Sequence, residues 1–126
     1  MKKIISTSNA PGAIGPYSQA IMANGVLYIS GQIPVNPSTG ELVEGITEET
    51  HQVMKNLDAI LKEAGMSFSN VVKSTIFLKD MGDFSAMNEV YASYFAEGNY
   101  PARETVQVSC LPKNVDVEIS MIAHQD

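Results

Sequence analysis

The sequence predicts an α+β fold, in which two helices pack on one face of a mixed β-sheet within a single domain spanning residues 1–126. The length of 126 residues and the hydrophobic content of 44% suit one domain with one core. Each helix-like segment follows strand-like alternation, and no repeat or linker-like stretch divides the chain. Because only two helices are available, one face of the sheet stays uncovered, which favours self-association.

The first part of the chain predicts a hairpin and a long loop. Residues 18–23 and 26–30 are strand-like, and the pair Asn24-Gly25 between them is typical of a tight hairpin turn. Several prolines and glycines in residues 32–45 indicate a surface loop.

A helix is expected next, beginning at Thr47 and ending near Gly65. The Thr47 side chain can cap this helix, and the acids Glu48 and Glu49 suit its positive N-terminal end. Gly65 is a natural stop signal. Apolar side chains recur at helical spacing: Val53, Leu57, Ile60, Leu61 and Ala64.

The second part predicts a strand, a helix and a closing hairpin. Residues 71–78 are rich in β-forming side chains, and Asp83 can cap a helix that ends near Gly98. Residues 104–110 and 115–122 form two closing strands, which we expect to pair with each other. The apolar stripe of the second helix consists of Phe84, Met87, Tyr91, Tyr94 and Phe95.

Alternation along the closing strands places an arginine and a glutamate on their polar sides. In the expected hairpin, Thr105 lies opposite Glu118 and Arg103 lies opposite Ser120, which makes Arg103 and Glu118 diagonal neighbours. Two interpretations remain open. The pair is either a structural ion pair on a solvated strand face, or a site in which Arg103 binds a substrate carboxylate through two hydrogen bonds. In the second case Glu118 orients water or transfers a proton.

Other reactive side chains give weaker signals. Cys110 falls on the apolar side of its strand, so we expect a small buried residue, and as the sole cysteine it has no disulfide partner in the chain. His51 is expected at the surface and His124 near the C-terminal end. Without a third ligand they make a poor metal site, so no metal is expected. None of the glycine-rich phosphate-binding motifs occurs.

The charge balance restricts the partners. Eight basic residues, among which Arg103 is the sole arginine, stand against 14 acids, and the net charge is −6 with a pI of about 4.8. This balance argues against binding to nucleic acid or to anionic membranes, although a local cationic pocket for a small anion is compatible with it. No signal-peptide pattern follows Lys2-Lys3, and no apolar run approaches the roughly 20 residues of a membrane span. We therefore expect a cytoplasmic protein.

Six ordered blocks of residues carry a family resemblance: Ala13–Ala20, Leu27–Pro34, Met87–Tyr91, Pro101–Arg103, Leu111–Lys113 and Val117–Ile119. They resemble the motifs of the reactive intermediate deaminase (Rid) family, in the same order and at similar spacing. Because the resemblance extends over nearly the whole chain, it is more specific than any single motif.

The resemblance implies a chorismate-mutase-like α+β sandwich that assembles as a homotrimer, with ligand clefts between adjacent subunits. It also implies an enzyme, a 2-iminobutanoate/2-iminopropanoate deaminase. Such an enzyme hydrolyses reactive 2-enamine and 2-imine acids, such as 2-aminoacrylate and 2-iminobutanoate, to 2-keto acids and ammonia. The family needs no cofactor and no metal.

The resemblance also implies roles for individual residues. Arg103 matches the arginine that binds the substrate carboxylate, and Glu118 matches the acid near the attacking water. The remaining matches are substrate-binding positions: Tyr17, Ser30, Gly31, Thr105 and, in a supporting place, Asn88.

Two residues depart from the family pattern, and both bear on the range of substrates. Thr105 stands where the archetypal subgroup often has cysteine, at a position that contacts ligand largely through its backbone. Glu104 stands where a small residue is common. Alternation sends Glu104 to the face of the strand opposite Arg103.

Three other functions form the alternatives. A non-catalytic protein that binds a keto acid for regulation would need Arg103 but not Glu118. A ribonuclease or translation inhibitor, a role attributed to some family members, is disfavoured by the acidic charge and by the lack of a basic stripe interleaved with aromatics. Chorismate mutase chemistry rests on fold analogy alone, and a single arginine is little charge for a substrate with two carboxylates.

Overall fold

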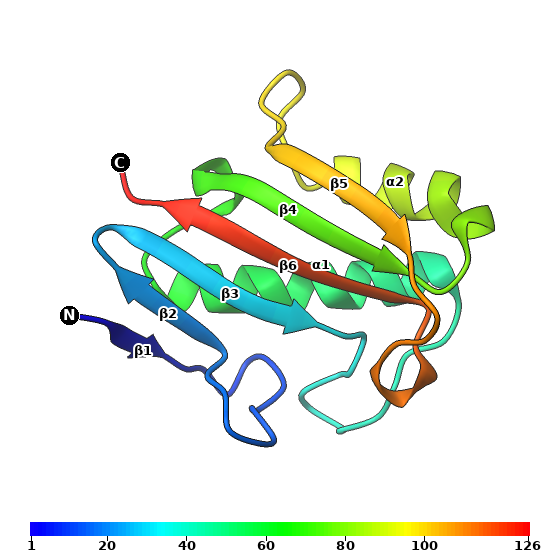
Figure 1. The fold of residues 1–126 in the computed structure, drawn as a ribbon, viewed down its shortest axis with the longest axis horizontal. Helices are drawn as coiled ribbons and strands as arrows, with labels where there is room; N and C mark the ends of the chain where they lie inside the picture. The colour runs from blue at the N-terminus through cyan, green and yellow to red at the C-terminus, as the bar shows by residue number, and fades with distance from the viewer.

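Two layers make up the structure, a computed structural model that describes residues 1–126 (Figure 1). The helices α1 (Ile46–Glu63) and α2 (Phe84–Ala92) lie on one face of a six-stranded sheet with the order β1-β2-β3-β6-β4-β5. The predicted α+β fold is therefore confirmed. The strands are β1 (Lys3–Ile5), β2 (Ala20–Ala23), β3 (Val26–Gln32), β4 (Val71–Leu78), β5 (Ala102–Gln107) and β6 (Val117–His124).

The sheet is mixed because one pair of strands is parallel. β4 and β5 run parallel and are joined through α2, as a parallel pair requires a crossover connection. β6 pairs antiparallel with both β3 and β4, so β4 lies between β5 and β6. The predicted closing hairpin is therefore wrong. Alternation shows which residues share a side of a strand, but it does not identify the neighbouring strand.

The core lies between α1 and the helix-facing side of the central strands. Alternate residues of β6 from Val117 to Ala123 are buried there, while the residues between them turn to the opposite face. The predicted apolar stripe of α1 is also buried, apart from half-buried Ala64 just past its end. The completely buried side chains include Leu27, Val53, Leu57, Ile60, Leu61, Ile76 and Ile119.

The ends of the helices differ from the prediction. α1 begins at Ile46 directly after Gly45, whose φ of 88° suits glycine, and no side chain caps it. Thr47 therefore lies inside the first turn and not at the cap. Asp83 precedes α2 without a capping hydrogen bond. The short strand β1 was not among the predicted elements, because three residues give too little alternation to reveal a strand.

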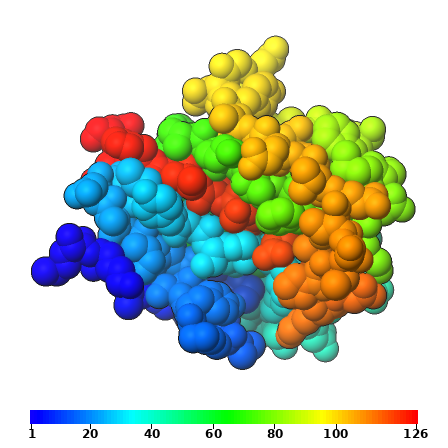
Figure 2. All heavy atoms as spheres, in the orientation of Figure 1, coloured from blue at the N-terminus to red at the C-terminus, as the bar shows by residue number.

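The helices leave the second face of the sheet uncovered. In Figure 1 they lie behind the sheet, and Figure 2 shows the uncovered face from the same direction. Tyr28 of β3 and Val106 of β5 expose 49% and 43% of their surface. Exposed apolar groups on an uncovered sheet face favour association with another protein surface. Neither helix has the length and apolar character of a membrane span.

Candidate active site

Arg103 lies on β5 and its side chain reaches the helix layer. Its register partner on β4 is Ser74, which is completely buried on the helix-facing side. Arg103 Nη1 donates a hydrogen bond to Asn88 Oδ1 of α2 at 2.6 Å. The guanidinium also lies over the rings of Tyr91 and Phe84, at 5.0 and 5.6 Å from the ring centroids. The guanidinium is thus held in place while most of its N–H donors keep no partner within the chain.

Three residues of α2 hold Arg103 because they share one side of the helix. Phe84, Asn88 and Tyr91 follow the i, i+4 and i+7 spacing of a helical face. The Tyr91 hydroxyl donates to Ser74 Oγ at 2.9 Å, which fixes the ring under the guanidinium. Burial raises the pKa of Tyr91, so its hydroxyl stays protonated and remains a donor. The sequence predicted the two aromatic residues only as packing groups, and missed that they also hold Arg103.

Glu118 lies on β6, on the face of the sheet away from the helices. Its neighbours Val117 and Ile119 are completely buried against the helices, so Glu118 points the other way. Its carboxyl group lies against Gly31 of β3, near the point where β3 and β6 shift register. Burial raises the pKa of Glu118 above the usual carboxyl value, and no charged neighbour contributes to the shift. A half-buried carboxyl group of this kind is suited to hold water and exchange protons.

Gly31 leaves the space that the Glu118 carboxyl group occupies. A Cβ atom at residue 31 would lie 2.8 Å from Glu118 Cδ and 3.1 Å from its Cγ. We therefore expect Gly31→Ala to displace the Glu118 carboxyl group and to lower the free energy of unfolding in urea denaturation by only about 1 kcal/mol, because this group is the end of a flexible side chain. Gly12→Ala is the matched control, because nothing lies within 4 Å of a Cβ atom there. Equal stability of the two variants would contradict this close packing.

Arg103 and Glu118 are not brought together within one chain. Arg103 pairs with Ser74 and Glu118 pairs with Phe77, so they lie at different positions along β4 and on opposite faces of the sheet. The predicted diagonal contact is therefore wrong, and the chain contains no ion pair between them. The cause is the position of β4 between β5 and β6. The polar side of β5 then meets Asn88 of α2 instead of the polar side of β6.

Tyr17 borders two hollows in the surface. It lies on the loop before β2 and is 53% exposed. One hollow, of about 480 Å³, includes Ser30, whose hydroxyl donates to the Ser18 carbonyl at 2.6 Å. The other, of about 470 Å³, includes Gly31 and is lined by one charged residue, Lys113. Tyr17 therefore links the surroundings of Ser30 to those of Gly31 and its neighbour Glu118.

The seven residues that the sequence predicts for the site fall into two groups. The first surrounds the arginine on the helix-facing side and consists of Arg103, Asn88 and Thr105. The second lies around the end of β3 and consists of Tyr17, Ser30, Gly31 and Glu118.

Thr105 carries a buried hydroxyl group without a hydrogen-bond partner. A buried hydroxyl in this state costs about 1–3 kcal/mol. We therefore expect Thr105→Val, which keeps the shape and removes the hydroxyl, to raise the free energy of unfolding by about 1 kcal/mol. Thr75→Val is the matched control, because the Thr75 hydroxyl donates to Glu104 Oε2 at 3.2 Å. Destabilisation by Thr105→Val, measured by urea denaturation, would show that the hydroxyl has a partner in solution.

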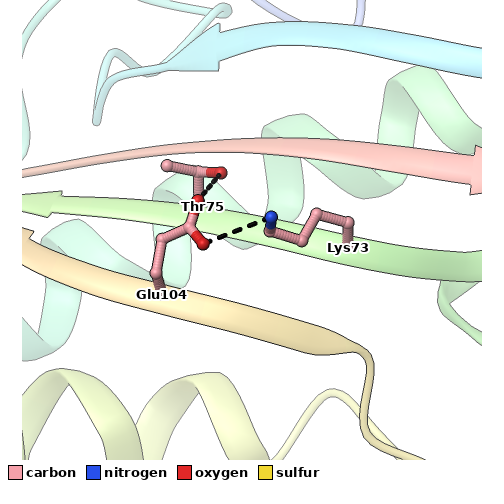
Figure 3. Close-up of polar contacts among 3 residues, drawn as sticks. All are labelled: Lys73, Thr75 and Glu104. Carbon is pink, nitrogen blue, oxygen red and sulfur yellow. Dashed lines mark hydrogen bonds and ion pairs between the residues drawn. The ribbon is translucent and has the colours of Figure 1, made fainter.

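Glu104 points away from Arg103, as alternation predicts. Figure 3 shows it on the open face of the sheet, where Lys73 Nζ forms an ion pair with its Oε1 at 3.2 Å. The Thr75 hydroxyl donates to its other oxygen. Glu104, one of the two departures from the family pattern, is therefore not part of the surroundings of Arg103.

Several other side chains differ from the prediction. Cys110 is exposed and not buried, because β5 ends at Gln107 and the alternation does not continue to residue 110. His51 is half-buried and its Nδ1 lies 2.8 Å from the Tyr94 hydroxyl. No group of three or more His, Cys, Asp or Glu side chains is arranged to hold a metal ion.

Glu49 is a further residue that sequence reasoning missed. It was predicted only as a favourable charge in the first turn of the helix, but it is 4% exposed and contacts the chain just before β6. The sequence did contain a signal that Glu49 is buried. Glu49 precedes Val53 by one helical turn, so it continues the apolar stripe of α1.

Comparison with known proteins identifies the family of the chain. The family model described as Endoribonuclease L-PSP matches residues 7–125. A human protein named 2-iminobutanoate/2-iminopropanoate deaminase is 51% identical over 126 residues, covering 99% of this chain and 91% of its own length.

Two solved structures are also similar. A Yersinia pestis protein of unknown function from the conserved Rid protein family is 54% identical, with a TM-score of 0.96 over 98% of this chain and 99% of its own. E. coli TdcF with bound serine is 43% identical, with a TM-score of 0.95 and the same coverage. With a family model that matches nearly the whole chain and relatives above 50% identity, the chain belongs to the Rid family.

Proposed function

We propose that the protein is a hydrolytic deaminase, which converts reactive 2-enamine and 2-imine acids to 2-keto acids and ammonia. The observation that carries the proposal is Arg103, an arginine fixed by Asn88 and two aromatic rings with its remaining donors free to bind a carboxylate. The relatives named 2-iminobutanoate/2-iminopropanoate deaminase support this substrate class. The serine bound to the similar E. coli protein also carries a carboxylate next to a nitrogen-bearing carbon.

The reaction needs little beyond orientation and one acid/base group. The enamine first takes a proton at its terminal carbon and becomes an imine, whose C2 is electrophilic. Water adds to C2 while Glu118 accepts its proton, and the π electrons of the C=N bond move to nitrogen, which is protonated. The carbinolamine then forms C=O, the C–N bond breaks and ammonia leaves. Orientation together with one positioned acid/base group is typically worth about 10²–10⁴-fold or more.

We propose further that the site is completed between copies of the chain, in a homotrimer. Arg103 and Glu118 lie on opposite faces of one sheet, so a single chain does not present both to one small substrate. The uncovered face of the sheet, with Tyr28 and Val106 exposed, offers a surface for such assembly. In this arrangement, the surroundings of Arg103 from one copy meet the surroundings of Glu118 from the next.

A coupled assay tests the deaminase proposal. A threonine dehydratase generates 2-iminobutanoate, and ammonia release is followed with the purified protein and with buffer alone. We expect faster release with the protein, and no acceleration would contradict the proposal. Calorimetry with 2-ketobutyrate, run beside the assay, detects the alternative in which the protein binds a keto acid without turnover.

A further inference from the structure

Glu49, a buried carboxyl group in the first turn of α1, holds the chain at the start of β6. Its Oε1 accepts the Asp116 N–H at 3.0 Å. The Asp116 carbonyl in turn accepts the Lys79 N–H at 3.0 Å. Asp116 is thus bound by α1 on one side and by the chain after β4 on the other, directly before β6 begins at Val117.

This contact acts on Glu118 through two residues of backbone. The first residues of β6 pair with the end of β4, so the position of Asp116 sets where the strand begins its pairing. Glu118 then lies against Gly31, where a Cβ atom would meet its carboxyl group. A shift at Asp116 therefore changes the contact between the Glu118 carboxyl group and Gly31.

Acids surround Glu49. Asp116, from the segment before β6, acts on Glu49 through its charge and through a hydrogen bond between the side chains, and Asp83, from the turn before α2, adds its charge. Asp80, directly before that turn, in turn adds its charge at Asp83. Burial and these neighbours raise the pKa of Glu49 to about 7, although the hydrogen bond from the Asp116 N–H favours the ionised form and lowers this pKa in part.

We propose that Glu49 is a positioning residue for Glu118, which keeps the start of β6 in place while Glu49 is protonated and loosens it when Glu49 ionises. This inference rests on the proposed role of Glu118 in the deaminase reaction. Protonated Glu49 donates to the Asp116 carboxylate and accepts from the Asp116 N–H, so both groups are held. Ionised Glu49 keeps the bond from the Asp116 N–H, but it loses the bond between the two carboxyl groups and repels the charges of Asp116 and Asp83.

The sign of the effect on stability follows from the direction of the shift. A carboxyl group whose pKa rises on folding stabilises the folded state fully below its unfolded pKa of about 4.3. The stabilisation is lost as pH rises to the folded value of about 7. The contact between Glu49 and the start of β6 therefore weakens as the pH rises from about 4.3 to about 7.

An NMR titration tests the coupling without any assay of activity. The ¹³C carboxyl resonance of Glu118 is followed between about pH 5 and pH 9 in the whole protein and in Glu49→Gln, which keeps the acceptor oxygen but has no proton to lose. We expect the wild-type Glu118 resonance to show a second inflection near the Glu49 transition, and the variant to lack it. Glu48→Gln is the matched control, since Glu48 is an exposed acid in the same turn. Identical Glu118 titrations in wild type and Glu49→Gln overturn the proposal.

Activity provides a second readout. The ratio of kcat for Glu49→Gln to that of wild type is expected to rise about threefold or more from about pH 6 to pH 8.5, and the Glu48→Gln ratio to stay flat. A flat Glu49→Gln ratio in an active enzyme overturns the positioning role. If the NMR coupling is present in a protein that releases no ammonia from any imine, the contact between Glu49 and β6 stands and the deaminase proposal fails.

Discussion

Replacing Arg103 with alanine is expected to lower kcat/KM for 2-iminobutanoate by about 10²–10⁴-fold. The loss follows from two hydrogen bonds between charged groups, each worth about 1.5–3 kcal/mol, with each tenfold in rate equal to about 1.4 kcal/mol. Asn88 and the rings of Tyr91 and Phe84 hold the guanidinium in place before the substrate arrives. Little side-chain conformational entropy is therefore lost on binding. Steady-state kinetics in the coupled ammonia assay measures the effect.

Two variants separate the geometry of Arg103 from its charge. Arg103→Lys keeps the charge but loses the planar fork and the stacking, so we expect an intermediate loss. Lys62→Ala removes one positive charge from the exposed side of α1, where Lys62 forms an ion pair with Asp58, and should leave kcat/KM unaltered. If Arg103→Ala retained kcat/KM within about threefold of wild type, the carboxylate would have another binding partner.

Glu118→Gln is expected to lower kcat by about 10²–10⁴-fold while affinity for 2-ketobutyrate stays close to wild type. Glutamine keeps the size of the side chain and its contact with Gly31 but transfers no proton. The comparison of turnover with calorimetric affinity therefore separates a catalyst from a binding protein. Glu63→Gln, an exposed acid at the end of α1, is the matched control.

The pH dependence of kcat gives a second test of Glu118. Burial raises the pKa of this group, and as a base it acts only when ionised, so kcat should fall as pH drops through a value above the usual carboxyl range. This acid limb should disappear in Glu118→Gln. A limb that persists unchanged in the variant would assign the titration to a different group.

Much of the fold could be predicted because alternation and helical spacing report directly on burial. The apolar stripe of α1 and the alternating apolar residues of β6 both face the core, as the sequence indicates. The pairing of β5 could not be predicted in the same way. Its partner depends on the path of α2, which brings the chain back parallel to β4, and no residue of β5 itself encodes that path.

The candidate site, like the fold, could be predicted only in part. Arg103 and Glu118 were found because a charged residue on a strand near the end of the chain is conspicuous, and the family resemblance assigned them roles. Their placement on opposite faces depends on strand order and could not be read from alternation. Glu49 was missed because an acid in the first turn of a helix has a common electrostatic explanation, which hid the fact that it is buried.

The position of β5 at the edge of the sheet has a consequence for solubility. An edge strand offers unpaired backbone groups to strands of other molecules, and long apolar edges are prone to aggregate. β5 pairs with β4 on one side only, and it carries the charges of Arg103 and Glu104 on its two faces. Charged side chains on an edge strand generally oppose the pairing of further strands. The edge of the sheet that carries the residue proposed to bind the substrate is thus also a charged edge, of the kind that disfavours aggregation.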